Sequence, residues 1–221
     1  SMPILVIKDK KTKRVSAFFV QAKGSDPYAL KFGLSFLQAT GYRDIINKSD
    51  GENSIVALKR GCAEQAGITA KPEESPAGDH QANGEIEVAV REVKRQCRAL
   101  KYALESKLGK ELDEKDPVLT WLPRHAADLI SRYRRGEDGK TPEQRRTGRQ
   151  WRKPAIQFGE KILFREARSQ PQLSTLQPVM EEGQYIGHHG RKGTLLVITS
   201  GGVKQGVSFR RLPPEERWPQ A

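Results

Sequence analysis

The stretch 75-SPAGDHQANGEIEVAVREVKRQCR-98 runs from a loop rich in proline and glycine into a charged segment with apolar residues at helical spacing. The apolar residues recur at alternating intervals of about one helical turn, and the repeat continues past this stretch: Ile86, Val90, Val93, Cys97, Leu100 and Leu104. This periodicity predicts the longest helix of the chain, with one apolar face turned toward a core.

A neighbouring face of the same helix is charged. A carboxylate opens this face and cations follow it at the same spacing: Glu87, Arg91, Lys94, Arg98 and Lys101. Periodicity alone favours a solvated face on which Glu87 and Arg91 form an ion pair that contributes roughly a few tenths of a kcal/mol. A single carboxylate ahead of a row of cations also leaves a functional role open.

The chain is strongly basic. Its 221 residues include 39 Lys and Arg against 27 Asp and Glu, which gives a formal net charge of +12. This excess favours a polyanionic partner, and nucleic acid is favoured over an anionic membrane. No segment approaches the roughly 18 consecutive apolar residues of a membrane span, and the N-terminus lacks the pattern of a signal peptide. We therefore expect an intracellular protein without a membrane partner.

Strands and helices alternate in the first part of the chain. Residues 3–21 predict a β-hairpin because β-branched and aromatic runs flank a turn-like DKKTK segment. Residues 28–41 predict a helix, residues 43–50 a short strand, and residues 53–67 a second helix. The ββαβα order predicts an α/β domain in which helices pack on a sheet.

Two helix starts depend on single residues. Asn53 is a suitable N-cap for the helix of residues 53–67, because its side chain can accept a hydrogen bond from the first turn. A further helix is expected to begin near Asp116-Pro117, and Pro123 must either kink it or mark its true start.

The last third of the chain changes character. Residues 132–153 are densely basic and form a connector that can be a helix or an extended arm. Beyond it, short apolar strands are punctuated by glycines, which predicts a small antiparallel β module with a barrel-like form. We therefore expect two domains, with residues 1–150 forming the α/β domain and residues 151–221 the small basic module.

Several motifs resemble the catalytic core of retroviral-type integrases, especially those of copia-like long-terminal-repeat retrotransposons. They are SDGENSI at 49–55, ESPAGDHQANGEIE at 74–87, GEDGKTPEQRRTGR at 136–149, GQYIGHHGRKGTLLVIT at 183–199 and FRRLPPEE at 209–216. The most specific element combines Asp50 with the set Gln81-x-Asn83-Gly84-x-x-Glu87. The interval from Asp50 to Glu87 is close to the one that this family places between its last two catalytic acids.

The resemblance implies an RNase H-like mixed sheet with flanking helices and an integrase-type polynucleotidyl transferase activity, in which element DNA is joined to target DNA. Asp50 and Glu87 would then be catalytic residues that hold Mg²⁺ or Mn²⁺, since hard divalent cations prefer carboxylate oxygens. No small-molecule substrate is implied. The family also implies a nuclear location and a homo-oligomer assembled on DNA ends.

The same resemblance implies the DNA-contacting residues. Cations on the helix face behind Glu87, amides in the loop before it, and arginines of the connector would lie along the DNA: Arg91, Lys94, Arg98, Gln81, Asn83, Arg145, Arg146 and Arg149. Glu87 would thus be a metal ligand whose polyanionic substrate lies along the same helix face.

The sequence departs from the family in one respect. The family uses three acids, and the strand that carries the first of them would lie ahead of the hairpin of residues 3–21, so we expect an N-terminally truncated core with exposed strand edges. Asp9 is the tempting substitute, but its place in the hairpin turn indicates a structural role. The alternative function is therefore a catalytically inactive or domesticated integrase fragment that binds nucleic acid. His188 and His189 are expected to be surface residues of the small module.

Overall fold

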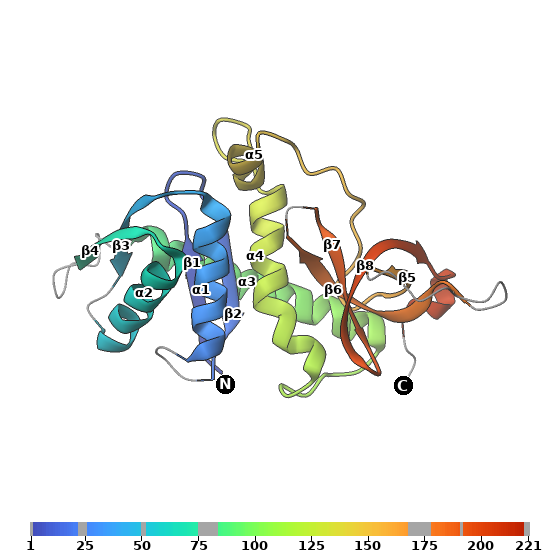
Figure 1. The fold of residues 1–221 in the computed structure, drawn as a ribbon. Coiled ribbons are helices and arrows are strands. Elements are labelled where there is room, and N and C mark those ends of the chain that lie inside the picture. Colours follow the sequence, from blue (N-terminus) through green and yellow to red (C-terminus); the bar gives the residue numbers. More distant parts are fainter. Residues whose placement is uncertain are drawn as a thin grey trace. The chain divides into compact units, whose positions relative to one another are not determined.

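The computed structural model describes residues 2–21, 26–49, 52–74, 84–167, 178–190 and 192–218. The chain divides into two compact units, Ser1–Lys94 with Ile130–Trp151, and Arg95–Leu129 with Arg152–Ala221 (Figure 1). The change of unit after Trp151 lies next to the expected domain boundary. The second unit, however, also takes residues from within the expected first domain.

The first unit opens with the expected β-hairpin. Strands β1 (Ile4–Lys8) and β2 (Val15–Phe19) pair antiparallel, with Ile4 opposite Phe19 and Lys8 opposite Val15. The hydroxyl of Ser131 then donates to the carbonyl of Val15 and accepts from its N–H, both at 3.0 Å. This reciprocal pair satisfies both polar backbone groups of a buried strand residue.

Asp9 stabilises the turn of the hairpin, as predicted. Its carboxylate accepts hydrogen bonds from the N–H of Lys11 at 3.1 Å and from the hydroxyl of Thr12 at 2.5 Å. The hydroxyl of Tyr42 also donates to it at 3.1 Å. Partial burial and the charge of Asp9 raise the pKa of Tyr42, which keeps this donor protonated. The carboxylate of Asp9 is thus committed to the turn.

Two helices follow with the expected ends. Helix α1 (Pro27–Thr40) is capped by Asp26 and ends at Gly41, and α2 (Asn53–Ala66) ends at Gly67, where both glycines have positive φ. The predicted N-cap Asn53 is wrong: the N-cap is Glu52, which makes no side-chain capping bond, and Asn53 is already the first residue of the helix. A residue inside the helix can no longer serve as its cap.

The strands of the first unit form two sheets where the sequence predicted one. Strand β3 (Asp44–Ser49) is the expected short strand, and it pairs in parallel with β4 (Thr69–Glu74), which was not predicted. Within the described residues, β1–β2 and β3–β4 form two separate two-stranded sheets. Helices α1 and α2 pack on each other, and their apolar residues form a core with the hairpin: Phe18, Val20, Ala29, Leu58 and Cys62.

Helix α3 (Gly84–Leu108) is the long helix predicted from the opening stretch. Val93 and Leu104 on its apolar stripe are buried, with exposed fractions of 0% and 3%. Beyond it lie the 3₁₀ helix η1 (Pro117–Trp121) and helix α4 (Leu122–Tyr133). Pro123 occupies the first turn of α4, so it marks the start of that helix.

The connector contains a short helix, α5 (Pro142–Thr147), which is capped by Thr141 and ends at Gly148. The C-terminal strands then form the expected antiparallel module as a closed barrel: β5 (Lys161–Glu166), β6 (Glu181–His189), β7 (Thr194–Thr199) and β8 (Gly202–Arg211). A second 3₁₀ turn, η2 (Pro214–Glu216), follows the barrel. The mixed α/β fold with an additional antiparallel module is confirmed, and barrel residues Ile186 and Leu196 share a core with Leu104 of α3.

The barrel interior is apolar and closely packed. Ile162, Phe164 and Val197 have exposed fractions of 0%, and Tyr185 packs with them. A Cβ on Gly206 would lie 3.0 Å from the ring of Phe164, so only glycine fits there without a shift.

His188 is buried, which corrects the expectation that it lies on the surface. Its Nδ1 is 2.6 Å from the hydroxyl of Tyr185, three residues earlier in β6. In a regular strand these two side chains would point to opposite faces, but the register of β6 shifts between Tyr185 and Gly187. His189 is exposed, as expected, and its Nδ1 lies 3.0 Å from Nη2 of Arg124.

The barrel core yields a stability prediction. Phe164→Ala should lower the unfolding free energy of the second unit by roughly 3–5 kcal/mol, because it removes a fully buried ring and leaves a cavity. Val203→Ala on β8, whose side chain is 46% exposed, is the matched control and should change it by less than about 0.5 kcal/mol. Denaturant unfolding monitored by tryptophan fluorescence measures both, and equal effects would contradict the barrel assignment.

Candidate nucleic-acid and metal site

The first turn of α3 is attached to the β-hairpin through Glu85. Lys8 donates to the carbonyl oxygen of Glu85 at 3.2 Å, and its Nζ lies 3.5 Å from the carboxylate. Lys13 lies 3.2 Å from the same carboxylate. Partial burial raises the pKa of Glu85, but the hydrogen bond and charge of Lys13, together with Lys8, outweigh it and hold that pKa below its usual value. Glu85 therefore stays ionised and bound to the hairpin.

Glu87 lies on another side of the helix. An α-helix turns by about 100° per residue, so a side chain two positions after Glu85 points roughly 200° away from it. Glu87 is accordingly exposed, and within the described residues its carboxylate makes no hydrogen bond or ion pair. The expected pair between Glu87 and Arg91 is not formed. The carboxylate of Glu87 is thus available to a partner from outside the described residues.

The cations behind Glu87 are exposed as predicted. Arg91, Lys94 and Arg98 are exposed side chains of α3. Lys101, the last cation of the stripe, is half-buried, and its Nζ lies 2.5 Å from the carboxylate of Glu105, one turn later. Lys101 is thus paired within its own helix.

Two connector arginines are engaged by carboxylates. Arg145 donates to Asp138 from Nε at 3.0 Å and from Nη2 at 2.5 Å, while Nη1 reaches the carbonyl of Thr12 at 3.4 Å. The hydrogen bond from Arg145, assisted by the N–H of Lys140, lowers the pKa of Asp138 to about 2. This pair attaches the connector to the turn of the hairpin.

Arg146 makes a second bidentate pair, with Glu143, at 3.1 and 2.5 Å. The two side chains have exposed fractions of only 8% and 12%, so the guanidinium of Arg146 presents little surface to a phosphate. Arg149, by contrast, is exposed. Among the three predicted DNA-contacting arginines of the connector, Arg149 is the one whose side chain faces solvent.

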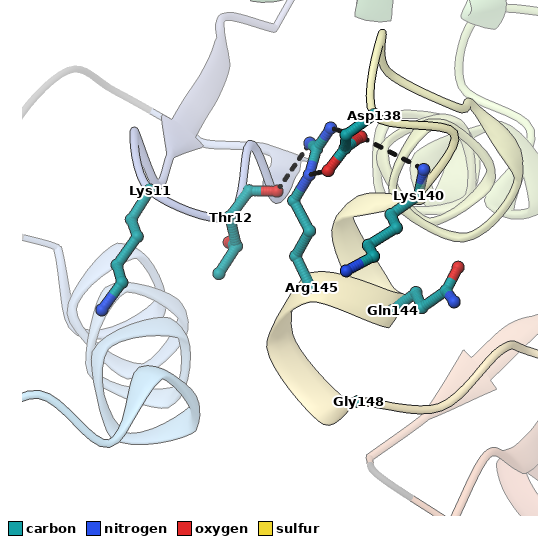
Figure 2. Close-up of a pocket in the computed structure, with 7 residues that line it drawn as sticks. All are labelled: Lys11, Thr12, Asp138, Lys140, Gln144, Arg145 and Gly148. Atoms are coloured by element: carbon teal, nitrogen blue, oxygen red, sulfur yellow. Dashed lines mark hydrogen bonds and ion pairs between the residues drawn. The ribbon is translucent and has the colours of Figure 1, made fainter.

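A polar pocket of about 390 Å³ lies between the hairpin turn and the connector (Figure 2). Its lining comes from both segments: Lys11, Thr12, Asp138, Lys140, Gln144, Arg145 and Gly148. Figure 2 shows Arg145 between Asp138 and Thr12, so the ion pair forms part of the pocket wall. Sequence reasoning did not find this pocket, because Asp138 and Arg145 contact each other across a turn that no periodic pattern encodes.

Three predicted site residues, Asp50, Gln81 and Asn83, lie outside the described residues. Within the part of the chain that the structure describes, no three His, Cys, Asp or Glu side chains are grouped as metal ligands. In the same part of the chain, no helix has the length and apolar character required to cross a membrane.

In sequence, the chain matches no family model and no curated protein. In structure, it is similar to the catalytic core domain of BIV integrase, with 20% identity over 66% of this chain and 85% of that chain and a TM-score of 0.44. It is also similar to a chain of the simian T-cell lymphotropic virus intasome in complex with the PP2A regulatory subunit B56 gamma. That likeness has 12% identity over 96% of this chain and 73% of the other, with a TM-score of 0.44.

The contact between Glu85 and the hairpin predicts a pH-dependent stability. Since the pKa of Glu85 is lowered on folding, its contribution is present above the unfolded value of about 4.3 and is lost as the pH falls through the lowered folded value. Glu85→Gln should reduce the melting temperature by roughly 1–3 °C at pH 7, and the difference should vanish by about pH 3. Scanning calorimetry across this range measures it.

Glu64→Gln on α2 is the matched control, because Glu64 is an exposed glutamate of the same unit. It should leave the melting temperature within about 1 °C of wild type at every pH. A Glu85→Gln effect that persists unchanged at low pH would show that the lysine contact is not its cause.

Proposed function

We propose that this chain is an integrase-type polynucleotidyl transferase that joins DNA ends to target DNA with the help of divalent cations. The observation that carries the proposal is the exposed carboxylate of Glu87 in the first turns of α3, followed on the same helix by exposed Arg91, Lys94 and Arg98. A carboxylate suits a metal, and a row of cations beside it suits the DNA backbone that must pass that metal.

The order of elements in the first unit supports an RNase H-like core. A hairpin, a helix, a strand, a second helix and the unpredicted strand β4 precede the long helix. The parallel β3–β4 pair with α2 as its crossover belongs to the α/β class. The copia-like relationship belongs to the proposal as well, because it rests on the motifs alone.

Asp50 and Glu87 would hold Mg²⁺ or Mn²⁺. The described residues fit this role at Glu87, whose carboxylate oxygens are exposed and make no competing ion pair with another described side chain. Asp50 would follow the last residue of β3, Ser49. A bound divalent cation would supply electrostatic stabilisation of charge on the transferring phosphoryl group. The protein's own contribution is to fix Glu87 on a helix whose rotation Glu85 sets.

DNA would lie along the cationic face of α3. Arg91, Lys94 and Arg98 would contact phosphates without reading bases, which positions the substrate in the manner of backbone contacts. Arg149 would extend this contact from the connector, while the ion pairs of Arg145 and Arg146 shape the connector itself. Gln81 and Asn83 would complete the contact from the loop before the helix. An assembly of copies on two DNA ends and a nuclear location belong to the same proposal.

A strand-transfer assay tests the catalytic part of the proposal. Wild-type chain should join a labelled DNA end to a target duplex in Mg²⁺ or Mn²⁺. Asp50→Asn and Glu87→Gln should each reduce the rate by roughly a hundredfold or more, because each removes a ligand charge at the reacting phosphate. Glu64→Gln on α2 is the matched control: it removes an exposed carboxylate of the same unit that takes no part in holding α3, and it should keep most of the activity.

Two results would contradict this part. Equal losses in Glu64→Gln and Glu87→Gln would assign the effect to a general change of charge or stability. A wild-type chain that is as inert as the Asp50 and Glu87 variants, yet binds DNA with a steep salt dependence, would be the catalytically silent DNA-binding fragment instead.

The salt dependence of DNA binding tests the proposed phosphate contacts. Arg91→Ala and Arg98→Ala should each lower the slope of log K against log salt concentration by about 0.9, because each removes one phosphate contact. Lys107→Ala removes an exposed cation from another face of α3 and should leave the slope unchanged. Fluorescence anisotropy with a duplex at several salt concentrations measures all three, and an equal effect of Lys107→Ala would argue for non-specific charge attraction.

A further inference from the structure

Tyr102 is an exposed aromatic residue in the second half of α3. Its side chain is 76% exposed, although a tyrosine ring normally buries much of its apolar surface. The residues of the opposite face of this half helix, Cys97, Leu100 and Leu104, pack in the core of the second unit. Because that packing fixes the rotation of the helix, the ring of Tyr102 is held toward solvent.

The surroundings of Tyr102 combine small and cationic side chains. Ala99 and Ser106, about one turn before and after it, are exposed and too short to cover the ring. Arg98 and Arg95, about one and two turns before it, are also exposed and lie on the same side of the helix. An aromatic ring is thus open to contact at the end of a row of guanidinium groups.

Glu105, the acidic residue of α3 nearest to Tyr102, is paired. Glu105 lies about one turn after Tyr102, and it accepts from Lys101 at 2.5 Å and from the N–H of Leu112 at 2.8 Å. The hydrogen bond from Leu112, followed by that from Lys101, lowers the pKa of Glu105, so the carboxylate stays paired. Glu105 is thus engaged by Lys101 and Leu112, while the exposed Arg95 and Arg98 lie on the side of the helix that carries Tyr102.

We propose that Arg95, Arg98 and Tyr102 form a binding site for unpaired nucleotides, an inference that rests on the proposed DNA-binding function. A base of a single strand stacks on the ring of Tyr102, and the neighbouring phosphates lie against Arg98 and Arg95. This combination of an aromatic platform with cations along the backbone is the general means of binding single strands. A paired base inside a duplex cannot offer its face to the ring, so the site selects frayed, overhanging or gapped DNA.

The alternative partner for an exposed tyrosine is another protein. The charge of the chain favours nucleic acid, because a formal net charge of +12 attracts a polyanion. Nucleic acid supplies both a base that can stack on the ring of Tyr102 and the negative charge that Arg95 and Arg98 attract.

Binding of a single-stranded oligonucleotide that contains 2-aminopurine tests the proposal in the full chain. Wild type should quench the fluorescence of the base through stacking. Tyr102→Ala should abolish the quenching and weaken single-strand binding by roughly tenfold, whereas Tyr102→Phe should retain both. Duplex binding should stay within about twofold for both variants. Tyr133→Ala on α4, which alters a tyrosine that is 46% exposed, is the matched control and should behave as wild type.

Each outcome of this experiment either supports or overturns the proposed stacking site at Tyr102. Single-strand affinity and quenching that are unchanged in Tyr102→Ala would overturn the inference while leaving the proposed function intact, provided that duplex binding persists. Equal losses for single strand and duplex would also overturn it, because a stacking site must spare the duplex. A wild type that binds the single strand through Tyr102 but binds no duplex would support the inference and contradict the proposed function. Thermal melts check that the variants are folded. Tyr102→Ala should melt close to wild type, since an exposed ring contributes little to stability.

Discussion

The hydrogen bond and ion pairs from Lys8 and Lys13 to Glu85 set the rotation of the first turns of α3. The candidate site depends on that rotation. Two carboxylates lie within three residues of this helix, and the lysines bind one of them. Helix geometry then directs Glu87 away from the hairpin, into solvent, at the start of a face that continues with Arg91. The structural role of Glu85 thus leaves Glu87 exposed.

Periodic patterns predicted most of the elements, whereas features set by contacts between distant residues were not predicted. The hairpin, the first three helices and the four barrel strands follow from apolar repeats and from glycine or proline at their ends. Strand β4 was missed because its sequence, TAKPEE, contains Pro72 and charged residues and lacks an apolar alternation. One predicted sheet became two ladders, and a bulge in β6 buried His188, because both depend on register that no local pattern records.

The sequence predicted only part of the candidate site, because the rest depends on contacts between distant residues. Exposure of Glu87 and of the cations behind it follows from the helical repeat, so the sequence was sufficient. The repeat did not distinguish Arg149 from Arg146, because the difference lies in the nearly buried pair that Arg146 makes with Glu143. The pocket at the hairpin turn likewise depends on Arg145 reaching both Asp138 and Thr12, whose positions are far apart in the chain. Residue type suggested a nucleic-acid contact at these arginines, and packing shows which of them faces solvent.

We propose that Asp50 and Glu87 share one divalent cation beside the cations of α3. A crystal structure of the chain in Mn²⁺, with anomalous scattering to locate the metal, tests it most directly. The account predicts an anomalous peak at coordination distance, about 2.0–2.2 Å, from a carboxylate oxygen of each residue. Carboxylates of Asp50 and Glu87 that lie too far apart for one ion, with manganese bound elsewhere or not at all, would contradict it.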